Sequence, residues 1–466
     1  MKRTTRGVNV MVLMAWWGRF QRNSATLMLA ATALVVSGCA SIDPYNIIGR
    51  RLPISSVDQS TNATPAVRKA AIDAVWNTVN DHYYRADLNG VDWRAARDTW
   101  RPLALAAATD DEFWERLDQM AGELSDVHTR VESPNAVAQR KEQQVLSLGL
   151  NIRLLDGALV VLSVNPESDA YWSGVRAGMR LLRIGGKDAN TQWRVWAQAA
   201  RKTSSPQAAL RMPLRRLNVV ANEAIRESAS ATFGLSFARV DGSEFDVRLR
   251  PKTLSTRPIV TSRVLPSGMG YVRFTSFQES LRSDVLAAIE KLKDTPALIL
   301  DLRGNGGGSG AMAEAIVGSF MKTKTIIGRT ETRTGKPVTL AFGVIKIASP
   351  EASVPGKHDA YAGKLAVLMD ADSASASEAA AGALQSTGRA IVVGEISCGC
   401  LLAFLGYAAL PGGGELAFSE IGFTNAKGER IEGRGVIPDV AVERKRTDFV
   451  EQRDRVLEAA QAVLLK

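Results

Sequence analysis

The stretch LILDLRGNGGGSG, residues 298–310, decides the fold predicted for this chain. It begins with a continuous apolar run, which is typical of a strand buried on both faces of a parallel sheet. Glycines follow, and they let the backbone turn tightly and approach a neighbour closely. Such a loop can point N–H groups at an anion, or it can be a tight turn without a ligand. Its spacing matches neither GxGxxG nor the lysine-containing phosphate loop.

Strand-like and helix-like patterns alternate on both sides of this stretch. In chain order they are 269–277 (strand), 282–293 (helix), 309–321 (helix, after the strand of the quoted stretch), 364–370 (strand), 376–388 (helix), 390–395 (strand) and 453–465 (helix). Alternation of this kind is typical of an α/β core, which we place at residues 256–466.

Two regions with different hydrophobic patterns precede this core. Residues 63–140 carry apolar residues at helical spacing and predict a small N-terminal helical domain. Residues 145–252 carry short alternating runs between glycine turns, which predicts a β-rich domain. The fold class is therefore α+β and multidomain, although residues 190–232 stay unassigned within the β-rich part.

The β-rich region resembles a PDZ domain of the bacterial protease type. The segment SGVRAGMRLLRIGG, residues 173–186, follows the helix–strand pattern of that family. The resemblance implies that Leu148, Gly149 and Leu150 form a substrate-binding loop, whose N–H groups hold a peptide carboxylate while the peptide adds a strand. The alternative is another small β-rich domain without this role.

The N-terminus has the pattern of an export signal. Basic residues precede an apolar run at 25–36, which is too short for a membrane span of roughly 20 residues. The run ends in VSGC, which resembles a bacterial lipobox. We expect a signal peptide at 1–38, a lipidated Cys39, and a tether at 39–62. This places the protein in the cell envelope, on the periplasmic side of the outer membrane. An ordinary signal peptide or an anchor helix is the alternative.

Net charge gives little reason to expect a nucleic-acid partner. The formal charge is +10, but five positive residues lie in the first 22 positions, so cleavage after residue 38 would leave +5. The chain has no Lys/Arg cluster interleaved with aromatic residues, which nucleic-acid binding would favour.

Cysteines and histidines are few and widely spaced. His82, His128 and His358 do not lie near a cysteine at the spacing of metal ligands, so we expect no metal and no cofactor. Cys398 and Cys400 are two positions apart, which predicts that they are too close for an easy disulfide.

The stretch SASASE, residues 373–378, lies between a predicted strand and a predicted helix. Ser375 and Glu378 form the S-x-x-E pattern of a capping box, which would explain this serine without chemistry. The alternative is a nucleophile at a helix N-terminus, where the helix dipole favours developing negative charge.

Five motifs occur in this order along the chain: GYVRFTSF (270–277), LILDLRGNGGG (298–308), SASASEAAAGALQ (373–385), GRAIVVGE (388–395) and IEGRGVIPDV (431–440). Together they resemble the C-terminal-processing (tail-specific) serine peptidase family. The resemblance implies a core of the ClpP/crotonase type with an inserted PDZ domain. It also implies that Ser375 is the nucleophile.

The chain departs from the lysine-dependent members of this family, because Cys400 stands where they carry the lysine base. A second branch, resembling the tricorn core protease, uses histidine and glutamate instead. The resemblance then implies that His128, in ELSDVHTRV, is the base and that Glu432 is its acid. A histidine needs almost no shift from its usual pKa of about 6.5 to act near neutral pH. Backbone N–H groups of Ala376 and Gly306 would form the oxyanion hole.

The resulting hypothesis is an envelope serine endopeptidase that acts on protein or peptide substrates through an acyl-enzyme. One alternative is an inactive homologue that serves as a PDZ-type binding scaffold. Another is a lysine-type enzyme with a substitute base, for which His128 would be dispensable.

Overall fold

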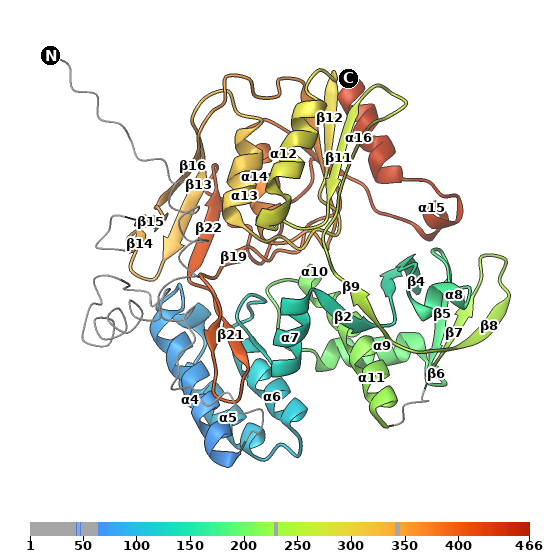
Figure 1. Cartoon of the computed structure of the whole chain (residues 1–466), viewed down its shortest axis with the longest axis vertical. Helices are drawn as coiled ribbons and strands as arrows, with labels where there is room; N and C mark the ends of the chain where they lie inside the picture. Colours follow the sequence, from blue (N-terminus) through green and yellow to red (C-terminus); the bar gives the residue numbers. More distant parts are fainter. Residues whose placement is uncertain (1–42, 44–46, 48–63, 228–231, 341–344) are drawn as a thin grey trace, which may run out of the picture.

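A computed structural model describes most of the chain after the N-terminal segment (Figure 1). The described residues are 43, 47, 64–227, 232–340 and 345–466. The predicted signal peptide, the lipobox and nearly all of the tether lie outside them. Within these ranges, no helix is both long enough and apolar enough to cross a membrane.

The core is a six-stranded sheet in the order β10-β11-β12-β17-β18-β23. All neighbouring strands are parallel except β10, which pairs antiparallel with β11. Every residue of β12 is buried, as its continuous apolar sequence predicts. The strands are β10 (Val260–Val264), β11 (Gly270–Phe274), β12 (Ala297–Asp301), β17 (Lys364–Met369), β18 (Ile391–Gly394) and β23 (Val440–Ala441).

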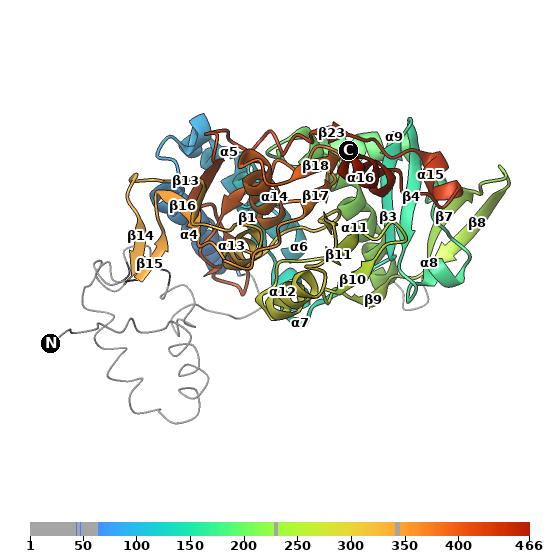
Figure 2. The ribbon, with the colours of Figure 1, turned by 90° about the horizontal axis from the view of Figure 1, so that it is seen from above.

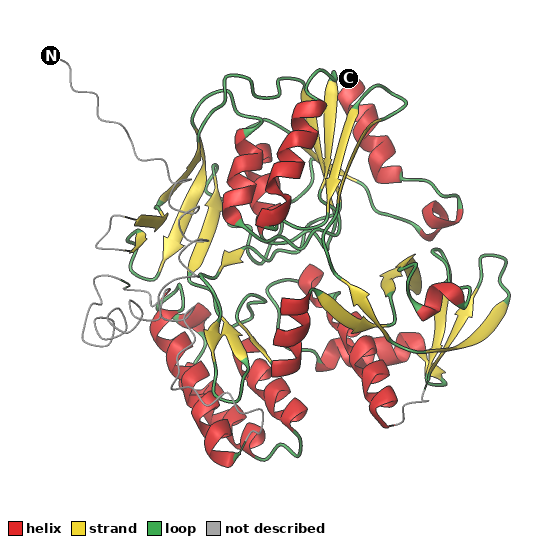
Figure 3. Ribbon diagram, viewed as in Figure 1, coloured by secondary structure: helices red, strands yellow, loops and turns green. Residues whose placement is uncertain are grey.

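Helices cover both faces of this sheet (Figures 1 and 3). One face packs against α12 (Arg282–Lys291), α13 (Gly310–Gly318) and α14 (Ala376–Ser386), and the other packs against α16 (Arg455–Leu465). The predicted α/β core is therefore confirmed. Because β12 and β17 are parallel neighbours, the loops that follow them leave the same edge of the sheet.

A second sheet lies beside the core and was not predicted from the sequence. Its order is β16-β13-β22-β19, and its strands are antiparallel. They are β13 (Thr325–Thr332), β16 (Glu351–Val354), β19 (Leu402–Ala403) and β22 (Ile421–Asn425), with the hairpin β14 (Val338–Leu340) and β15 (Ile345–Ala348) nearby.

The helical region, residues 64–142, contains α4 (Pro65–His82), α5 (Trp93–Leu105), α6 (Asp110–Gly122) and α7 (Pro134–Glu142), with the 3₁₀ turn η1 (Leu88–Gly90). Side chains of Thr64, Asp92 and Thr109 cap the first three helices. The hydrophobic core of this region also includes side chains from residues 402–418. Strand β1 (Arg130–Glu132) pairs with β21 (Glu415–Ala417), which pairs with β20 (Ala408–Ala409). The helical region thus shares its interior with a distant segment of the chain.

The β-rich unit, residues 144–255, lies at one end of the molecule, opposite β14 and β15 (Figure 2). Its sheet has the order β3-β4-β5-β7-β8, with β6 paired to β5. Within the unassigned residues 190–232, the described part (190–227 and 232) contains most of α9, then α10 and α11. The elements are β2 (Gln144–Ser147), β3 (Leu150–Leu155), β4 (Ala158–Val164), α8 (Asp169–Trp172), β5 (Arg180–Ile184), β6 (Lys187–Asp188), α9 (Ala189–Ala199), α10 (Pro206–Ala209), α11 (Met212–Glu227), β7 (Phe233–Ala238), β8 (Glu244–Leu249) and β9 (Lys252–Ser255).

Candidate active site

Ser375 lies on a sharp turn between β17 and α14. Its backbone has φ 57° and ψ −118°, which is an uncommon conformation for a residue with a side chain. Its N–H group is 2.9 Å from both the Cys400 carbonyl oxygen and Glu378 Oε2. The side chain is half-buried and still reaches solvent. Backbone strain of this kind clusters at functional sites, where the surrounding structure must hold it.

The glycine loop, residues 302–309, packs directly against this turn. Gly307 has φ +92°, and a Cβ there would lie 2.6–2.8 Å from Ala374 O, Ser375 Cβ and Ala376 N. The carbonyl of Asn305 accepts hydrogen bonds from Ala374 N (3.0 Å) and Ser377 Oγ (2.8 Å). The motifs around Ser375 and around the glycines are therefore one structural unit.

The two predicted oxyanion-hole residues differ in their surroundings. Ala376 opens α14, and the first N–H groups of a helix have no partner within the helix. Gly306 is exposed, and a Cβ added to it would meet no atom within 4 Å. Gly307 approaches Ser375 more closely, but its own N–H donates to Asn305 Oδ1 at 2.9 Å. Its N–H is therefore already engaged.

Glu378 is fully buried and binds four donors. Its Oε2 accepts from Ser375 N and Cys400 N, each at 2.9 Å, and its Oε1 accepts from Ser397 Oγ (2.5 Å) and Gly399 N (2.7 Å). Burial raises the pKa of Glu378, and these hydrogen bonds oppose that rise. In the predicted capping box, the glutamate side chain accepts a hydrogen bond from the main-chain N–H of the capping serine, and the bond from Ser375 N to Glu378 is this interaction. Ser375 can therefore cap α14 and also be a nucleophile, because this bond holds its backbone and does not involve its hydroxyl.

Cys398 and Cys400 form a disulfide, so the prediction that they are too close for one is wrong. Gly399 between them has φ +68°, which lets the chain turn so tightly that the Cα atoms of Cys398 and Cys400 are 5.2 Å apart. That separation lies within the usual range for a disulfide. The position of the family's lysine therefore holds an oxidised sulfur that cannot act as a base.

His128 lies between α6 and β1 and is 8% exposed. Its main-chain N–H donates to Asp126 Oδ1 (2.8 Å), and its ring Nδ1 is 4.0 Å from the same oxygen. Nδ1 is buried and has no hydrogen-bond partner among the described residues. Burial lowers the pKa of His128 to about 4; the Asp126 charge opposes this change and the Arg130 charge adds to it. The imidazole pKa thus departs from the ordinary value expected from the sequence.

Asp126 is a buried carboxylate that sequence reasoning did not single out. It accepts hydrogen bonds from the hydroxyls of Thr129 and Ser419, each at 2.6 Å. Ser419 follows β21, so this carboxylate joins the helical region to a distant part of the chain. Its position two residues before His128 is the only signal in the sequence.

Glu432 is largely buried and only half satisfied. Its Oε2 accepts from Leu401 N at 2.5 Å, whereas Oε1 is buried and has no partner among the described residues. Burial raises the pKa of Glu432 well above its usual value, and the negative charges of Asp126 and Glu378 raise it further. The Ser204 hydroxyl and the Leu401 N–H act in the opposite direction.

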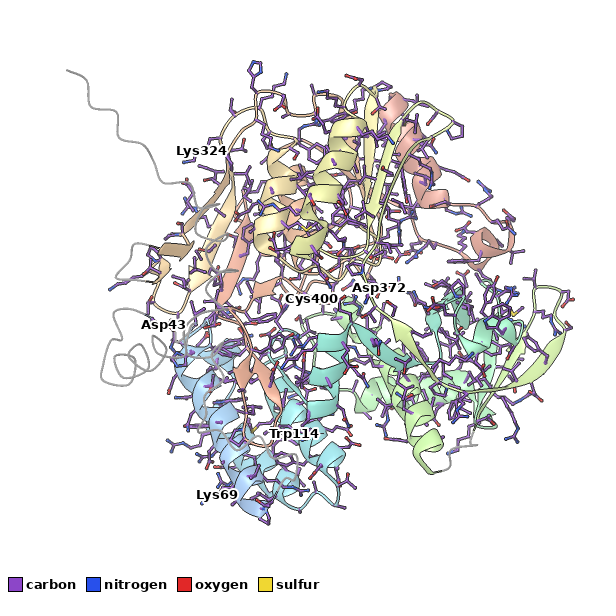
Figure 4. All side chains as sticks on the ribbon, in the orientation of Figure 1. Asp43, Lys69, Trp114, Lys324, Asp372 and Cys400 are labelled. Carbon is purple, nitrogen blue, oxygen red and sulfur yellow. A yellow bond between two sulfur atoms is a disulfide. The ribbon has the colours of Figure 1, made fainter. Side chains whose placement is uncertain are left out.

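These residues converge on the cysteine loop, residues 396–401. Cys400 O accepts from Ser375 N, and the next residue, Leu401, donates to Glu432. Val127, which precedes His128, packs against a buried cluster that contains Ala374, Ala208 and the two cysteines. Figure 4 shows Cys400 and Asp372 at the junction of the core with the lower parts of the molecule. Among the described residues, no hydrogen bond joins the His128 ring directly to Ser375 or Glu432.

The predicted carboxylate-binding loop is already engaged within the protein. Leu148 N donates to Asn218 Oδ1 (3.1 Å), and Gly149 N donates to Ser147 Oγ (3.0 Å). Leu150 begins β3 and pairs with Val164. A peptide carboxylate would therefore have to displace the Asn218 side chain, which α11 provides.

The part of the chain described by the structure contains no group of three or more His, Cys, Asp or Glu side chains that could hold a metal ion.

Comparison with known proteins adds an independent line of evidence. Residues 268–442 match peptidase family S41, and residues 66–122 match the tricorn protease C1 domain. A carboxyl-terminal-processing protease of Picosynechococcus sp. is 26% identical over 382 residues, which cover 79% of this chain and 81% of that protein. Putative tricorn protease homolog 2 of Streptomyces coelicolor is 25% identical over 85% of this chain but only 32% of its own length.

Solved structures show the same fold. A photosystem II D1 C-terminal processing protease superposes with a TM-score of 0.52 at 20% identity, covering 81% of this chain and 93% of that one. Mature CPAF gives a TM-score of 0.62 at 14% identity, covering 86% and 97%. Fold and family matches together define the chain as a serine-type peptidase, a hydrolase. The matches over residues 66–122 and 268–442, together with relatives named for carboxyl-terminal processing, support the resemblance to the C-terminal-processing serine peptidase family.

Proposed function

We propose that this peptidase is an endopeptidase with Ser375 as nucleophile, His128 as general base and Glu432 as the acid that stabilises the imidazolium. Ser375 Oγ attacks the substrate carbonyl carbon while its proton passes to His128. The resulting oxyanion accepts hydrogen bonds from Ala376 N and Gly306 N. When the C–N bond breaks, His128 returns the proton to the leaving amine. Water then hydrolyses the acyl-enzyme with the same base.

The observation that carries this proposal is a pair of buried polar atoms without partners. Among the described residues, six buried side-chain polar atoms have no hydrogen-bond partner; His128 Nδ1 and Glu432 Oε1 are the two whose segments meet at the cysteine loop. Buried polar atoms in native proteins are nearly always satisfied, so two exceptions in one region indicate a functional site. An acid and an imidazole can satisfy each other, directly or through one water, when a substrate closes the site.

The lowered pKa of His128 keeps the imidazole in the neutral form that a general base needs, and it also makes the ring a weaker base than an ordinary histidine. At neutral pH an imidazole with a pKa of about 4 is almost wholly unprotonated and free to accept the serine proton. Charge that then develops on the ring would favour ionisation of Glu432, whose pKa is raised while it has no partner.

Two lysines of the described chain are candidate substitute bases, Lys364 and Lys427. Lys364 begins β17, whereas Ser375 follows the end of that strand, and Lys364 Nζ bonds the Leu464 carbonyl at 3.1 Å. Lys427 follows β22 and lies outside the motifs that form the site. The substitute-lysine hypothesis therefore has less support than the histidine hypothesis.

The substrate and the location are also part of the proposal. We infer that the β-rich unit is a PDZ-like domain that receives protein C-termini, because relatives named for carboxyl-terminal processing cover most of the chain. We further infer that Cys39 anchors the protein by lipid in the bacterial envelope. Cys39→Ala should release the protein from membranes, and unchanged fractionation with membranes would contradict the anchor.

The activity is tested by incubating an envelope extract with purified protein and with its Ser375→Ala variant, followed by mass spectrometry of new peptide termini. We expect new termini with the wild type only. Identical termini in both samples would remove Ser375 from the chemistry. New termini in neither sample, with no labelling by a serine-reactive fluorophosphonate, would favour the inactive binding scaffold.

A further inference from the structure

The cysteine loop carries the Cys398–Cys400 disulfide, and it is hydrogen-bonded to both the proposed acid, Glu432, and the proposed nucleophile, Ser375. Residues 396–401 have no regular secondary structure. Both cysteines are nevertheless fully buried. A segment that lacks a helix or strand ladder needs other bonds to hold it in one conformation.

We propose that the Cys398–Cys400 disulfide is a positioning element for the peptidase reaction, because it fixes the backbone groups that hold Ser375 and Glu432. The inference rests on the proposed roles of those two residues. It assigns the cysteines no contact with the substrate.

On the nucleophile side, the loop holds the turn that carries Ser375. Cys398 N donates to Ser373 O (2.9 Å), and Cys400 O accepts from Ser375 N (2.9 Å). These bonds enclose Ala374, the residue directly before the proposed nucleophile. Because the Ser375 backbone is in an uncommon conformation, loss of either bond would let it relax.

On the acid side, the same loop bonds Glu432 and the residue that follows it, Gly433. Leu401 N donates to Glu432 Oε2 (2.5 Å), and Gly433 N donates to Gly399 O (2.9 Å). The disulfide closes a small ring that contains Gly399, and Leu401 is the first residue after this ring. It therefore restrains the backbone at both contacts. A shift of the loop would therefore move the acid and the nucleophile together.

Buried Glu378 bonds both the cysteine loop and the Ser375 turn. Its carboxylate accepts from the N–H groups of Gly399 and Cys400 as well as from that of Ser375. One carboxylate thus binds the disulfide ring and the proposed nucleophile together, so a change in the position of one would alter its bonds to the other.

The chemistry of the cysteines makes the inference testable. A dithiol such as dithiothreitol reduces the disulfide to two thiols, and the reagent is oxidised to its cyclic disulfide, with two electrons and two protons transferred. Arg211 Nη1 lies 3.8 Å from Cys398 Sγ, where its charge would favour the leaving thiolate. Both sulfurs are buried, so reduction requires local opening and long incubation. Disulfides persist in oxidising compartments, which agrees with the proposed export.

The experiment compares the wild type, oxidised and reduced, with the double variant Cys398→Ser/Cys400→Ser. A displacement of about 1 Å at a catalytic group can cost on the order of 10²-fold in rate. We therefore expect kcat to fall about 10- to 100-fold on reduction, with KM little changed, and to recover on reoxidation. The double variant should show the same low kcat and no response to dithiothreitol. Unchanged kcat in the double variant, with Ser375→Ala inactive, would overturn the positioning role and leave the proposed function intact.

Hydrogen–deuterium exchange provides a readout that does not depend on activity. Reduction should speed exchange in peptides that contain the Ser375 and Leu401 amides, while the peptide covering α12 should not change. This result is expected even if no substrate is ever cleaved, in which case only the proposed function fails. Equal protection of these amides in both redox states would overturn the inference. Faster exchange across the whole chain would mean a general stabilising role and would also overturn it.

Discussion

At the scale of single residues, the site depends on unusual backbone positions. Ser375 has a positive φ although it carries a side chain, and Gly307 opposes it with a φ of +92°. The absence of a Cβ at Gly307 lets the glycine loop pack against Ser375 and Ala376. A second residue-level feature is the burial of the His128 imidazole, which lowers its pKa.

Gly307→Ala should abolish most activity and destabilise the fold. The new Cβ would lie 2.6–2.8 Å from three atoms of residues 374–376, two of them backbone atoms, and the positive φ would be strained as well. Gly310→Ala is the matched control, since a Cβ there meets no atom within 4 Å and helix α13 gains a better helix former. Hydrolysis of a quenched protein substrate and thermal unfolding report both effects. Equal behaviour of the two variants would mean that close packing of the glycine loop is unimportant.

The pKa of His128 predicts the acid limb of the activity profile. A base with a pKa of about 4 is neutral at pH 6.5, so kcat/KM should not change as the pH is lowered through 6.5 and should decline only as the pH approaches 4.

The free energy of unfolding should depend on pH between 6.5 and about 4. The unfolded chain takes up the imidazole proton below about pH 6.5, whereas the folded chain does so only near 4, so stability falls as pH falls between these values. His128→Gln should lose this contribution, measured by urea unfolding at several pH values. A kcat/KM limb centred near 6.5 would contradict the burial argument.

At the scale of elements, the site is assembled where β12 and β17 end. Parallel neighbours bring the glycine loop and the start of α14 to one edge of the sheet. Glu378, one turn into α14, then connects the helix to the cysteine loop. The cap formed by Glu378 thus has two functions, because it accepts a hydrogen bond from the N–H of the residue before α14 and sets the backbone position of Ser375, the proposed nucleophile.

Glu378→Gln should reduce stability by about 1–3 kcal/mol and lower activity. The carboxylate accepts from four donors, and an amide NH₂ in its place would face donors without an acceptor. The control is Glu290→Gln, on the exposed side of α12, where the pair with Lys293 is open to solvent. Urea unfolding and substrate hydrolysis measure the two effects. A Glu378→Gln protein as stable and active as the control would show that the buried network does not hold the loop.

The sequence predicted the elements whose signal is local. The apolar run of β12 and the glycines after it define one edge of the sheet, and SASASE defines the start of α14. The cysteine pair could not be predicted from spacing, because the disulfide depends on the positive φ of Gly399. Asp126 was missed because its partner Ser419 lies far along the chain. The sheet containing β13 and β22 was missed for the same reason, since its pairing is long-range.

At the scale of the whole molecule, the proposed triad comes from distant segments. His128 belongs to the helical region, whereas Ser375 and Glu432 belong to the core. Side chains from 402–418 enter the interior of the helical region, and Asp126 bonds Ser419 just beyond them. The C-terminal part of the chain thereby fixes the helical region, and with it His128, against the core. A helical region that folded alone would leave the position of the base undefined.

The most direct test of the account is kcat/KM for purified wild type, His128→Ala and His358→Ala on one quenched protein substrate, with folding checked for each. His358 is exposed on a loop and serves as the matched control. We expect His128→Ala to lose on the order of 10³- to 10⁴-fold or more, as removal of a triad member does, and His358→Ala to match the wild type. If His128→Ala stays within about tenfold of wild type, a loss of only about 1.4 kcal/mol in transition-state stabilisation, His128 is not the base.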